Sequence, residues 1–133
     1  MTYQYKKTID KFELDTLNAE VESFCESHNV PAGKLFSVQL IIEELVTNII
    51  KYGSGDSSSA TIELALTVDG GQIKLMIADN SAAFNPLEHE EADTALPLEE
   101  RGVGGLGLFL VRKKVQSLSY EYKDGYNVMN AVI

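Results

Sequence analysis

Two kinds of hydrophobic spacing succeed one another along the first part of the chain. Apolar and polar residues alternate from Tyr3 to Ile9, and this period of two predicts an opening β-strand. From Phe12 to about His28 the apolar residues recur every three or four positions, which predicts an amphipathic helix with Asp10 as its candidate cap. His28, at the end of this helix, is interpreted as a surface or capping residue rather than a ligand.

A second helix, opened by Pro31 and ending near Tyr52 and Gly53, is predicted to have two different faces. Its apolar positions follow a spacing of three and four. They are Leu35, Val38, Ile42, Leu45 and Ile49. On another edge, Glu44, Asn48 and Lys51 follow the same spacing, with Ser37 and Thr47 nearby. These polar groups suit a metal-bound phosphate and a proton acceptor, but an ordinary solvated helix surface explains them as well.

The rest of the predicted sheet comes from two hairpins. Residues 60–68 and 72–79 alternate around Asp69, Gly70 and Gly71, and residues 117–123 and 126–133 flank Asp124 and Gly125. The polar stretch 53–59 before the first hairpin is predicted to be a loop. Asp79 ends the second strand of the first hairpin, where it either faces a ligand or begins a turn.

The segment between the hairpins contains a long acidic loop and then a cluster of glycines. Residues 84–101 have no hydrophobic period, and loops of this length in a compact domain are often functional lids. The next residues, GVGGLG at 102–107, stand at the front of a third predicted helix that continues through 108–115. Four glycines in six residues exceed what a sharp turn requires. They favour an anion site at free backbone N–H groups, with Arg101 as a candidate phosphate partner.

Composition and charge narrow the class of protein. With 133 residues, 44% hydrophobic and 23% charged, the chain is predicted to form one globular domain over residues 1–133. A net charge of −9 argues against nucleic acid as the main partner. Cys25 is the single cysteine, which excludes an intramolecular disulfide. The chain has neither a signal-peptide pattern nor an apolar run long enough for a bilayer, so we expect a cytoplasmic protein without a membrane partner.

Other phosphate-binding motifs fit the glycine cluster poorly. Gly102, Gly104 and Gly107 satisfy GxGxxG, with Asp124 downstream, but a dinucleotide fingerprint should follow directly on a strand in a repeated parallel unit. Here the glycines follow an acidic loop, and only a hairpin remains. The cluster also lacks the GK[ST] ending of a Walker loop, and the catalytic-loop signature of the eukaryotic-type protein kinases is missing from the chain.

In their order along the chain, these motifs resemble the Bergerat ATP-binding fold of gyrase and the histidine kinases. The greatest likeness is to the bacterial anti-sigma factor kinases, which are serine-protein kinases of similar length. It covers nearly the whole chain and is carried best by EELVTNIIKYG and ERGVGGLGLFLVRK. The resemblance implies an α+β fold, a two-layer α/β sandwich with a mixed, mostly antiparallel sheet and helices packed on one face.

The resemblance also implies roles for individual residues in binding ATP and Mg²⁺. Asn48 would hold the magnesium ion, and Glu44 would orient or deprotonate the attacking hydroxyl. Asp79 would accept a hydrogen bond from the adenine amino group. Glycines and amides of the 102–107 turn would cradle the phosphates, and Arg101 would face the phosphates or the protein partner. The other positions carried over as nucleotide-binding are Lys51, Tyr52, Ser81, Phe84, Gly102, Gly104, Gly105, Leu106 and Gly107.

The function implied is that of a partner-switching kinase. Such a protein phosphorylates a serine or threonine of an anti-sigma factor antagonist, a small STAS-type protein, and otherwise holds a sigma factor inactive. The family precedent is a homodimer. Larger relatives hydrolyse ATP with a catalytic lysine from a further domain, which these 133 residues do not contain, so hydrolysis is the less favoured activity.

One departure from the family pattern leaves a second function open. The family places a glycine two positions after the adenine-binding aspartate, where this chain has Ser81. A side chain at a position that requires positive φ, or close approach of the backbone to adenine, would weaken nucleotide binding. The alternative is therefore a module of the same fold that sequesters a regulator with little or no kinase activity.

Overall fold

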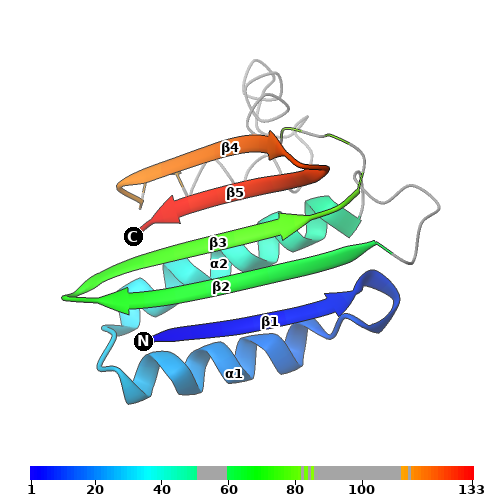
Figure 1. Cartoon of the computed structure of the whole chain (residues 1–133). Helices are drawn as coiled ribbons and strands as arrows, with labels where there is room; N and C mark the ends of the chain where they lie inside the picture. Colours follow the sequence, from blue (N-terminus) through cyan, green and yellow to red (C-terminus); the bar gives the residue numbers. More distant parts are fainter. Residues whose placement is uncertain (51–59, 82, 84, 86–111, 114) are drawn as a thin grey trace, which may run out of the picture.

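The computed structural model describes residues 1–50, 60–81, 83, 85, 112–113 and 115–133 of the chain (Figure 1). Over these residues the fold is α+β, with helices before the hairpins and a single sheet. The elements are β1 (Thr2–Thr8), the 3₁₀ helix η1 (Ile9–Lys11), α1 (Leu14–Ser27), α2 (Ala32–Asn48), β2 (Thr61–Asp69), β3 (Gln72–Asp79), β4 (Ser117–Lys123) and β5 (Tyr126–Val132). The opening strand, the first two helices and both hairpins are therefore confirmed.

The sheet has five strands in the order β1-β2-β3-β5-β4. Every pair of neighbouring strands in it is antiparallel, so the described sheet is antiparallel where a mixed, mostly antiparallel one was expected. Both hairpins turn through two residues with positive φ: Gly70 and Gly71 at 57° and 83°, Asp124 and Gly125 at 53° and 83°. Positive φ at both positions is the type I′ geometry, whose twist matches that of the flanking strands.

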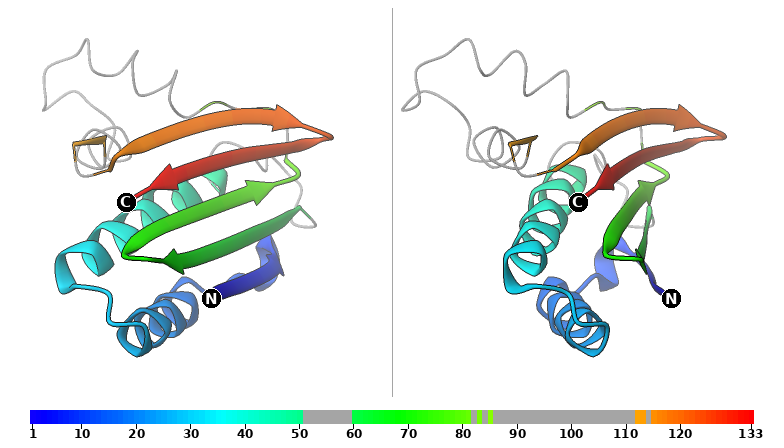
Figure 2. Two further views of the ribbon diagram at one scale, coloured as in Figure 1. Left: turned by 60° about the vertical axis from the view of Figure 1, so that its left-hand side comes forward. Right: turned by 90° about the vertical axis from the view of Figure 1, so that its left-hand side faces the viewer.

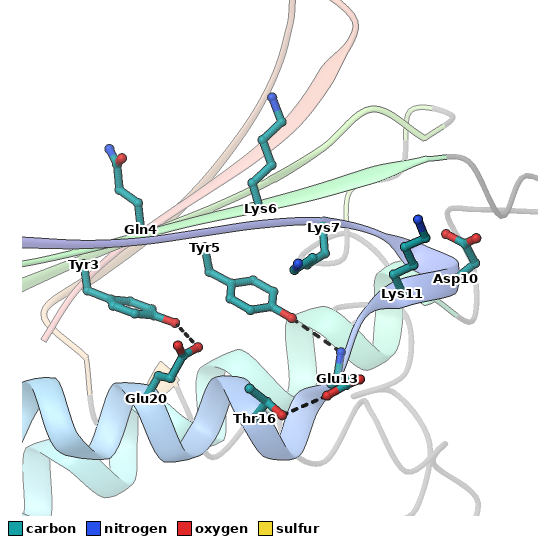
Figure 3. Close-up of a pocket in the computed structure, with 10 residues that line it drawn as sticks. All are labelled: Tyr3, Gln4, Tyr5, Lys6, Lys7, Asp10, Lys11, Glu13, Thr16 and Glu20. Atoms are coloured by element: carbon teal, nitrogen blue, oxygen red, sulfur yellow. Dashed lines mark hydrogen bonds between the residues drawn. The ribbon is translucent and has the colours of Figure 1, made fainter.

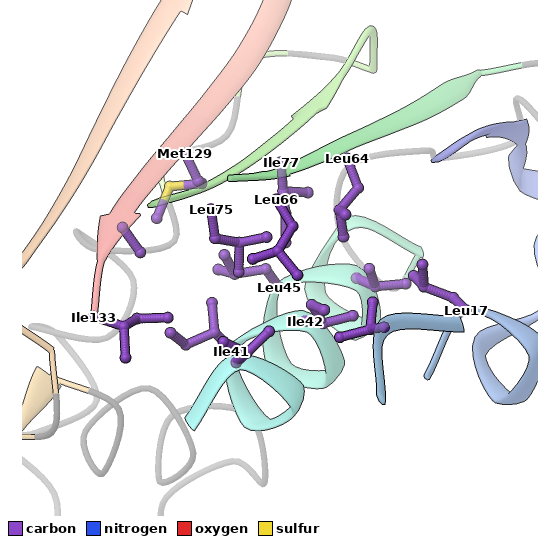
Figure 4. Close-up of a cluster of buried hydrophobic side chains, with 14 of the residues drawn as sticks. Leu17, Ile41, Ile42, Leu45, Leu64, Leu66, Leu75, Ile77, Met129 and Ile133 are labelled. Carbon is purple, nitrogen blue, oxygen red and sulfur yellow. The ribbon is translucent and has the colours of Figure 1, made fainter. Parts of the chain in front are cut away.

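Both helices cover the same face of the sheet, so the described elements form two layers (Figure 2). The core lies between the layers, because alternate residues of the central strands point toward the helices. From the sheet these are Ile62, Leu64, Leu66, Ile73, Leu75, Ile77, Met129 and Ala131. Figure 4 labels Leu64, Leu66, Leu75, Ile77 and Met129 of this set. On α2, Val38, Ile42 and Leu45 are buried against them, and Leu35 and Ile49 are partly buried at the edge of the same core. The apolar stripe predicted for this helix is thereby confirmed.

The predicted end of the second helix near Tyr52 and Gly53 lies outside the described residues, and two of the other three predicted helix ends agree with the structure. His28 caps the C-terminus of α1, with its Nδ1 2.8 Å from the backbone oxygen of Phe24, as expected for a capping residue. Pro31 directly precedes the first residue of α2. The prediction that Asp10 caps α1 is wrong, because Asp10 lies within η1 and the N-cap position is taken by Glu13, without a side-chain cap.

Three predicted segments lie outside the described residues. They are the loop at 53–59, nearly all of the expected lid at 84–101, and the glycine turn with most of the third helix at 102–115. None of the described helices is long and apolar enough to cross a membrane.

Candidate functional site

The candidate site lies where α2 and β3 end. Figures 1 and 2 show the C-terminal end of α2 and the C-terminal end of β3 at the same end of the two-layer structure. Asn48 is the last residue of α2, and Asp79 is the last residue of β3. The fold therefore brings to one end of the molecule two polar residues that are 31 positions apart, as the difference of 79 and 48.

Asp79 is buried, at 3% exposure, and is held by hydrogen bonds from two directions. One of its oxygens, Oδ2, accepts from the backbone N–H of Ser81 at 3.1 Å and from Nδ2 of Asn127 at 3.1 Å. Asn127 stands directly opposite Asp79 in the β3–β5 register. Among the described residues none donates to the other oxygen, Oδ1, which leaves it as an acceptor for a ligand.

Asn127 is in turn oriented by Tyr120. The Tyr120 hydroxyl donates to Oδ1 of Asn127 at 2.5 Å, so the amide presents Nδ2 to Asp79 and, at 3.4 Å, to the backbone oxygen of Ser81. Asn127 is 5% exposed. A chain of hydrogen bonds thus runs from β4 through β5 to the end of β3 and holds the carboxylate in one orientation.

Ser81 adopts a backbone conformation that any residue tolerates. The described non-glycine residues with positive φ are Asn29 and Asp124, so Ser81 does not occupy the region that favours glycine. The conformational reason for expecting weak nucleotide binding therefore does not apply here. The side chain is 7% exposed, and the described residues provide its Oγ with no hydrogen-bond partner.

Glu44 lies one helical turn before Asn48 on α2 and is half-buried. Burial, reinforced by repulsion from Glu43, raises the pKa of its carboxyl from 4.5 to about 7. Such a carboxyl exchanges its proton near neutral pH, which suits a general base.

Asn48 is 7% exposed, so it does not belong to a solvated helix face. The amide oxygen of a residue this buried suits a hard cation such as Mg²⁺. The described residues hold no cluster of three His, Cys, Asp or Glu side chains that could bind a metal by themselves. A magnesium ion at Asn48 would therefore need further oxygen ligands, as nucleotide phosphates provide.

Four of the predicted site residues are described, and the structure places all four at this end of the molecule or next to it: Glu44, Asn48, Asp79 and Ser81. The others, which lie outside the described residues and stay predictions, are Lys51, Tyr52, Phe84, Arg101, Gly102, Gly104, Gly105, Leu106 and Gly107.

The sequence interpretation missed Tyr120 and Asn127. The alternation of the last strand did contain a signal, because Asn127 shares its face with Met129 and Ala131, which are buried. An asparagine at a core-facing position of a strand needs a polar partner. The identity of that partner depends on which strand pairs with β5.

A different cavity, of about 780 Å³, lies along β1 and the start of α1 (Figure 3). Tyr3 donates to Glu20 at 2.8 Å, and the Tyr5 hydroxyl accepts from the backbone N–H of Glu13 at 3.5 Å. These lining groups are hydrogen-bonded to one another. None of them belongs to the hydrogen-bonded cluster formed by Asp79, Ser81, Asn127 and Tyr120. We therefore place the candidate site at the end of β3 rather than here.

The sequence of the chain is similar to a known family and to two bacterial kinases. A family model described as a histidine kinase-like ATPase domain matches residues 9–133. The chain is 34% identical over 92 residues to the serine/threonine-protein kinase BtrW of Bordetella bronchiseptica, covering 69% of this chain and 65% of the relative. It is 26% identical over 97 residues to the serine-protein kinase RsbW of Oceanobacillus iheyensis, covering 69% and 61%. The match thus spans less than two thirds of the length of either kinase.

Two solved structures share the fold. The SiaB–SiaC complex from Pseudomonas aeruginosa matches 98% of this chain and 88% of that chain, with a TM-score of 0.67 and 15% identity. The RsbU and RsbW domains of a Mycobacterium tuberculosis protein match 98% of this chain and 32% of that chain, with a TM-score of 0.65 and 14% identity. At these identities the likeness establishes the fold alone.

Proposed function

The chain belongs to the histidine kinase-like ATPase domain family, and from this premise we propose that it is an ATP-dependent protein serine/threonine kinase of the anti-sigma factor type. The observation that carries the proposal is that α2 and β3 end at the same end of the fold, α2 with the buried amide of Asn48 and β3 with the fixed acceptor Asp79. One group suits the base of a nucleotide, and the other suits the metal on its phosphates. The two kinase relatives support the type of reaction.

Different residues would bind the adenine end and the phosphate end of the nucleotide. Asp79 accepts a hydrogen bond from the adenine amino group through Oδ1, because Oδ2 is already used by Ser81 and Asn127. Asn48 would hold Mg²⁺ through its amide oxygen. When bound, the ion supplies charge neutralisation for the phosphates during phosphoryl transfer.

Glu44 then acts on the incoming hydroxyl. With a pKa of about 7, its carboxyl is substantially ionised at neutral pH and still basic enough to accept a proton. It lies one helical turn from Asn48, which supports a role beside the proposed metal position. We assign to it the orientation and deprotonation of the serine or threonine of the partner.

The partner that we propose is a small STAS-type anti-sigma factor antagonist, with a sigma factor as the competing ligand in the cytoplasm. One of the structural neighbours was solved as a complex of two proteins, SiaB and SiaC, which is consistent with a fold that presents a protein-binding surface. Competition between two partners would let the nucleotide state shift the population of complexes.

Nucleotide binding is tested by thermal unfolding with Mg-ATP. At a concentration of about 100 times Kd, a ligand that binds the folded state alone stabilises it by about 2.7 kcal/mol, or several degrees in Tm. We expect this shift in the unchanged protein and its loss in Asn48→Ala. Thr47→Ala, an exposed neighbour on α2, is the matched control and should keep the shift. A protein with no shift at millimolar Mg-ATP would instead be the sequestering module.

Phosphoryl transfer is tested with the partner protein and labelled ATP. Glu44→Gln should lower the rate at least about 100-fold while ATP still binds, because general bases contribute about 10²–10⁴-fold. Glu43→Gln, at the exposed adjacent position, should retain most of the rate. Transfer at the normal rate by Glu44→Gln would refute the assignment of the base.

A further inference from the structure

Ser81 carries a buried hydroxyl that has no hydrogen-bond partner among the described residues. The residue is 7% exposed, and no described group forms a hydrogen bond with its Oγ. Buried polar groups are almost always paired in folded proteins, so an unpaired hydroxyl calls for an explanation. A ligand that supplies the missing partner is one such explanation.

The position of Ser81 links this hydroxyl to the proposed base-binding end of the site. The backbone N–H of Ser81 donates to Oδ2 of Asp79 at 3.1 Å, and its backbone oxygen accepts from Nδ2 of Asn127 at 3.4 Å. Both backbone groups of Ser81 are thus hydrogen-bonded, the N–H to Asp79 and the oxygen to Asn127. The residue cannot shift without breaking these contacts.

The hydrogen bonds among the described residues of the cluster leave two polar groups available to a ligand. Tyr120 donates to Oδ1 of Asn127, which fixes the amide, and the Nδ2 of Asn127 is directed to Asp79 and Ser81. Among the described residues, the groups that remain without a partner are Oδ1 of Asp79, which only accepts as a carboxylate, and Oγ of Ser81, which can donate. An acceptor beside a donor matches adenine, whose amino group donates and whose neighbouring ring nitrogens accept.

We propose that the Ser81 hydroxyl donates a hydrogen bond to a ring nitrogen of adenine, N1 or N7, next to the amino group that Asp79 accepts. This inference rests on the proposed function, because it requires ATP in this site. It reverses the expectation that serine in place of the family's glycine weakens binding. Instead, the serine adds a contact that a glycine at this position cannot make.

Calorimetric titration with Mg-ATP tests the contact. Ser81→Ala should bind about threefold to tenfold more weakly than the unchanged protein, the range expected for loss of one hydrogen bond. Ser81→Gly should also bind more weakly. Ser119→Ala removes a hydroxyl from an exposed position of the same sheet and should leave the affinity unchanged. Equal affinity in Ser81→Ala, or tighter binding by Ser81→Gly, would overturn the inference.

Two nucleotide analogues identify the atom on the base. In 1-deaza-ATP and 7-deaza-ATP one ring nitrogen is replaced by carbon, which removes that acceptor. With one of the two analogues, Ser81→Ala and the unchanged protein should bind equally well. If the substitution costs the same factor with ATP and with both analogues, the hydroxyl does not contact the ring and the inference is wrong.

The Tm of the unliganded protein distinguishes this ligand-binding role of Ser81 from a structural one. Because the described residues give its hydroxyl no hydrogen-bond partner, Ser81→Ala should have an unchanged or higher Tm without nucleotide. A clearly lower Tm would show that the hydroxyl has a partner within the protein and would contradict the inference. If the unchanged protein binds no nucleotide, the proposed function itself fails, which is a different result from equal binding by both proteins.

Discussion

At the scale of single residues, Glu44 has a protonation state that depends on its burial. Partial burial disfavours the charged carboxylate, and repulsion from Glu43 adds to this, so the pKa rises to about 7. A surface glutamate would be ionised throughout the physiological range and would be a weaker base. The half-buried side chain is thus better matched to proton transfer near neutral pH.

This pKa predicts how phosphoryl transfer depends on pH. The rate should rise with pH around a midpoint near 7, because only the ionised carboxylate accepts the proton of the incoming hydroxyl. Initial rates measured between about pH 5.5 and 8.5 check this. Glu43→Gln removes the repulsive neighbour and should move the midpoint to lower pH. A rate that is constant across this range would argue against Glu44 as the base.

The same shift makes a prediction for stability, with a definite sign. The folded protein binds the Glu44 proton more tightly than the unfolded chain does, since the folded pKa lies above the ordinary 4.5. The contribution of Glu44 to stability is therefore fully present below about pH 4.5 and is lost as the pH rises through about 7. In urea titrations, Glu44→Gln should be more stable than the unchanged protein at pH 8, and this advantage should shrink toward pH 5. An equal difference at both pH values would contradict the shift.

At the scale of elements, the two hairpins depend on turn residues with positive φ. Gly71 and Gly125 both have φ of 83°, and an added Cβ would meet no atom within 4 Å at either position. The need for glycine there is thus a matter of backbone conformation and not of space. This is why the two turns could be identified from a few letters of sequence.

Gly71→Ala should destabilise the protein by about 1–2 kcal/mol, because alanine is strained at this positive φ. Gly33→Ala is the matched control, since Gly33 also has open space around it but lies in the first turn of α2. In a helix, alanine is favoured over glycine by up to about 1 kcal/mol. Urea titrations of the two variants should therefore shift in opposite directions, and a shift in the same direction would refute the conformational explanation.

At the scale of the whole molecule, one core joins the sheet to both helices. Ile77 is 1% exposed at the centre of the sheet, paired with Leu64 on one side and Met129 on the other. It also points to the same face as Asp79, two residues along the same strand. The core and the candidate site are thus neighbouring parts of one layer.

Ile77→Ala should lower the free energy of unfolding by about 2–5 kcal/mol, through lost burial and the cavity that remains. Ile77→Val removes one methylene at the same place and should cost about 0.5–1.5 kcal/mol. The urea midpoint should fall in this order while the m-value stays constant. Equal losses for the two variants would show that the position is not tightly packed.

The elements that depend on local spacing could be predicted from the sequence. The strands, the two helices and the hairpin turns follow from periods of two and 3.6 and from turn residues, which act over a few positions. Glu44 and Asn48 could be paired for the same reason, since one helical turn separates them. The assignment of Asp10 is wrong because the chain forms η1 at Ile9–Lys11 before α1 begins, and the exact start of a helix is not fixed by a capping residue type alone.

Contacts between distant segments were decided only by the tertiary structure. Asn127 is hydrogen-bonded to Asp79 because β5 pairs with β3, and the two residues lie 48 positions apart. The burial of Asn48 likewise depends on how the end of α2 packs, and the ordinary backbone of Ser81 depends on bonds to Asp79 and Asn127. The sequence by itself therefore determined the elements and their turns, because these depend on neighbouring residues. Only the folded sheet determined which polar groups meet at the site and which are left for a ligand, because strand pairing joins parts of the chain that no local pattern connects.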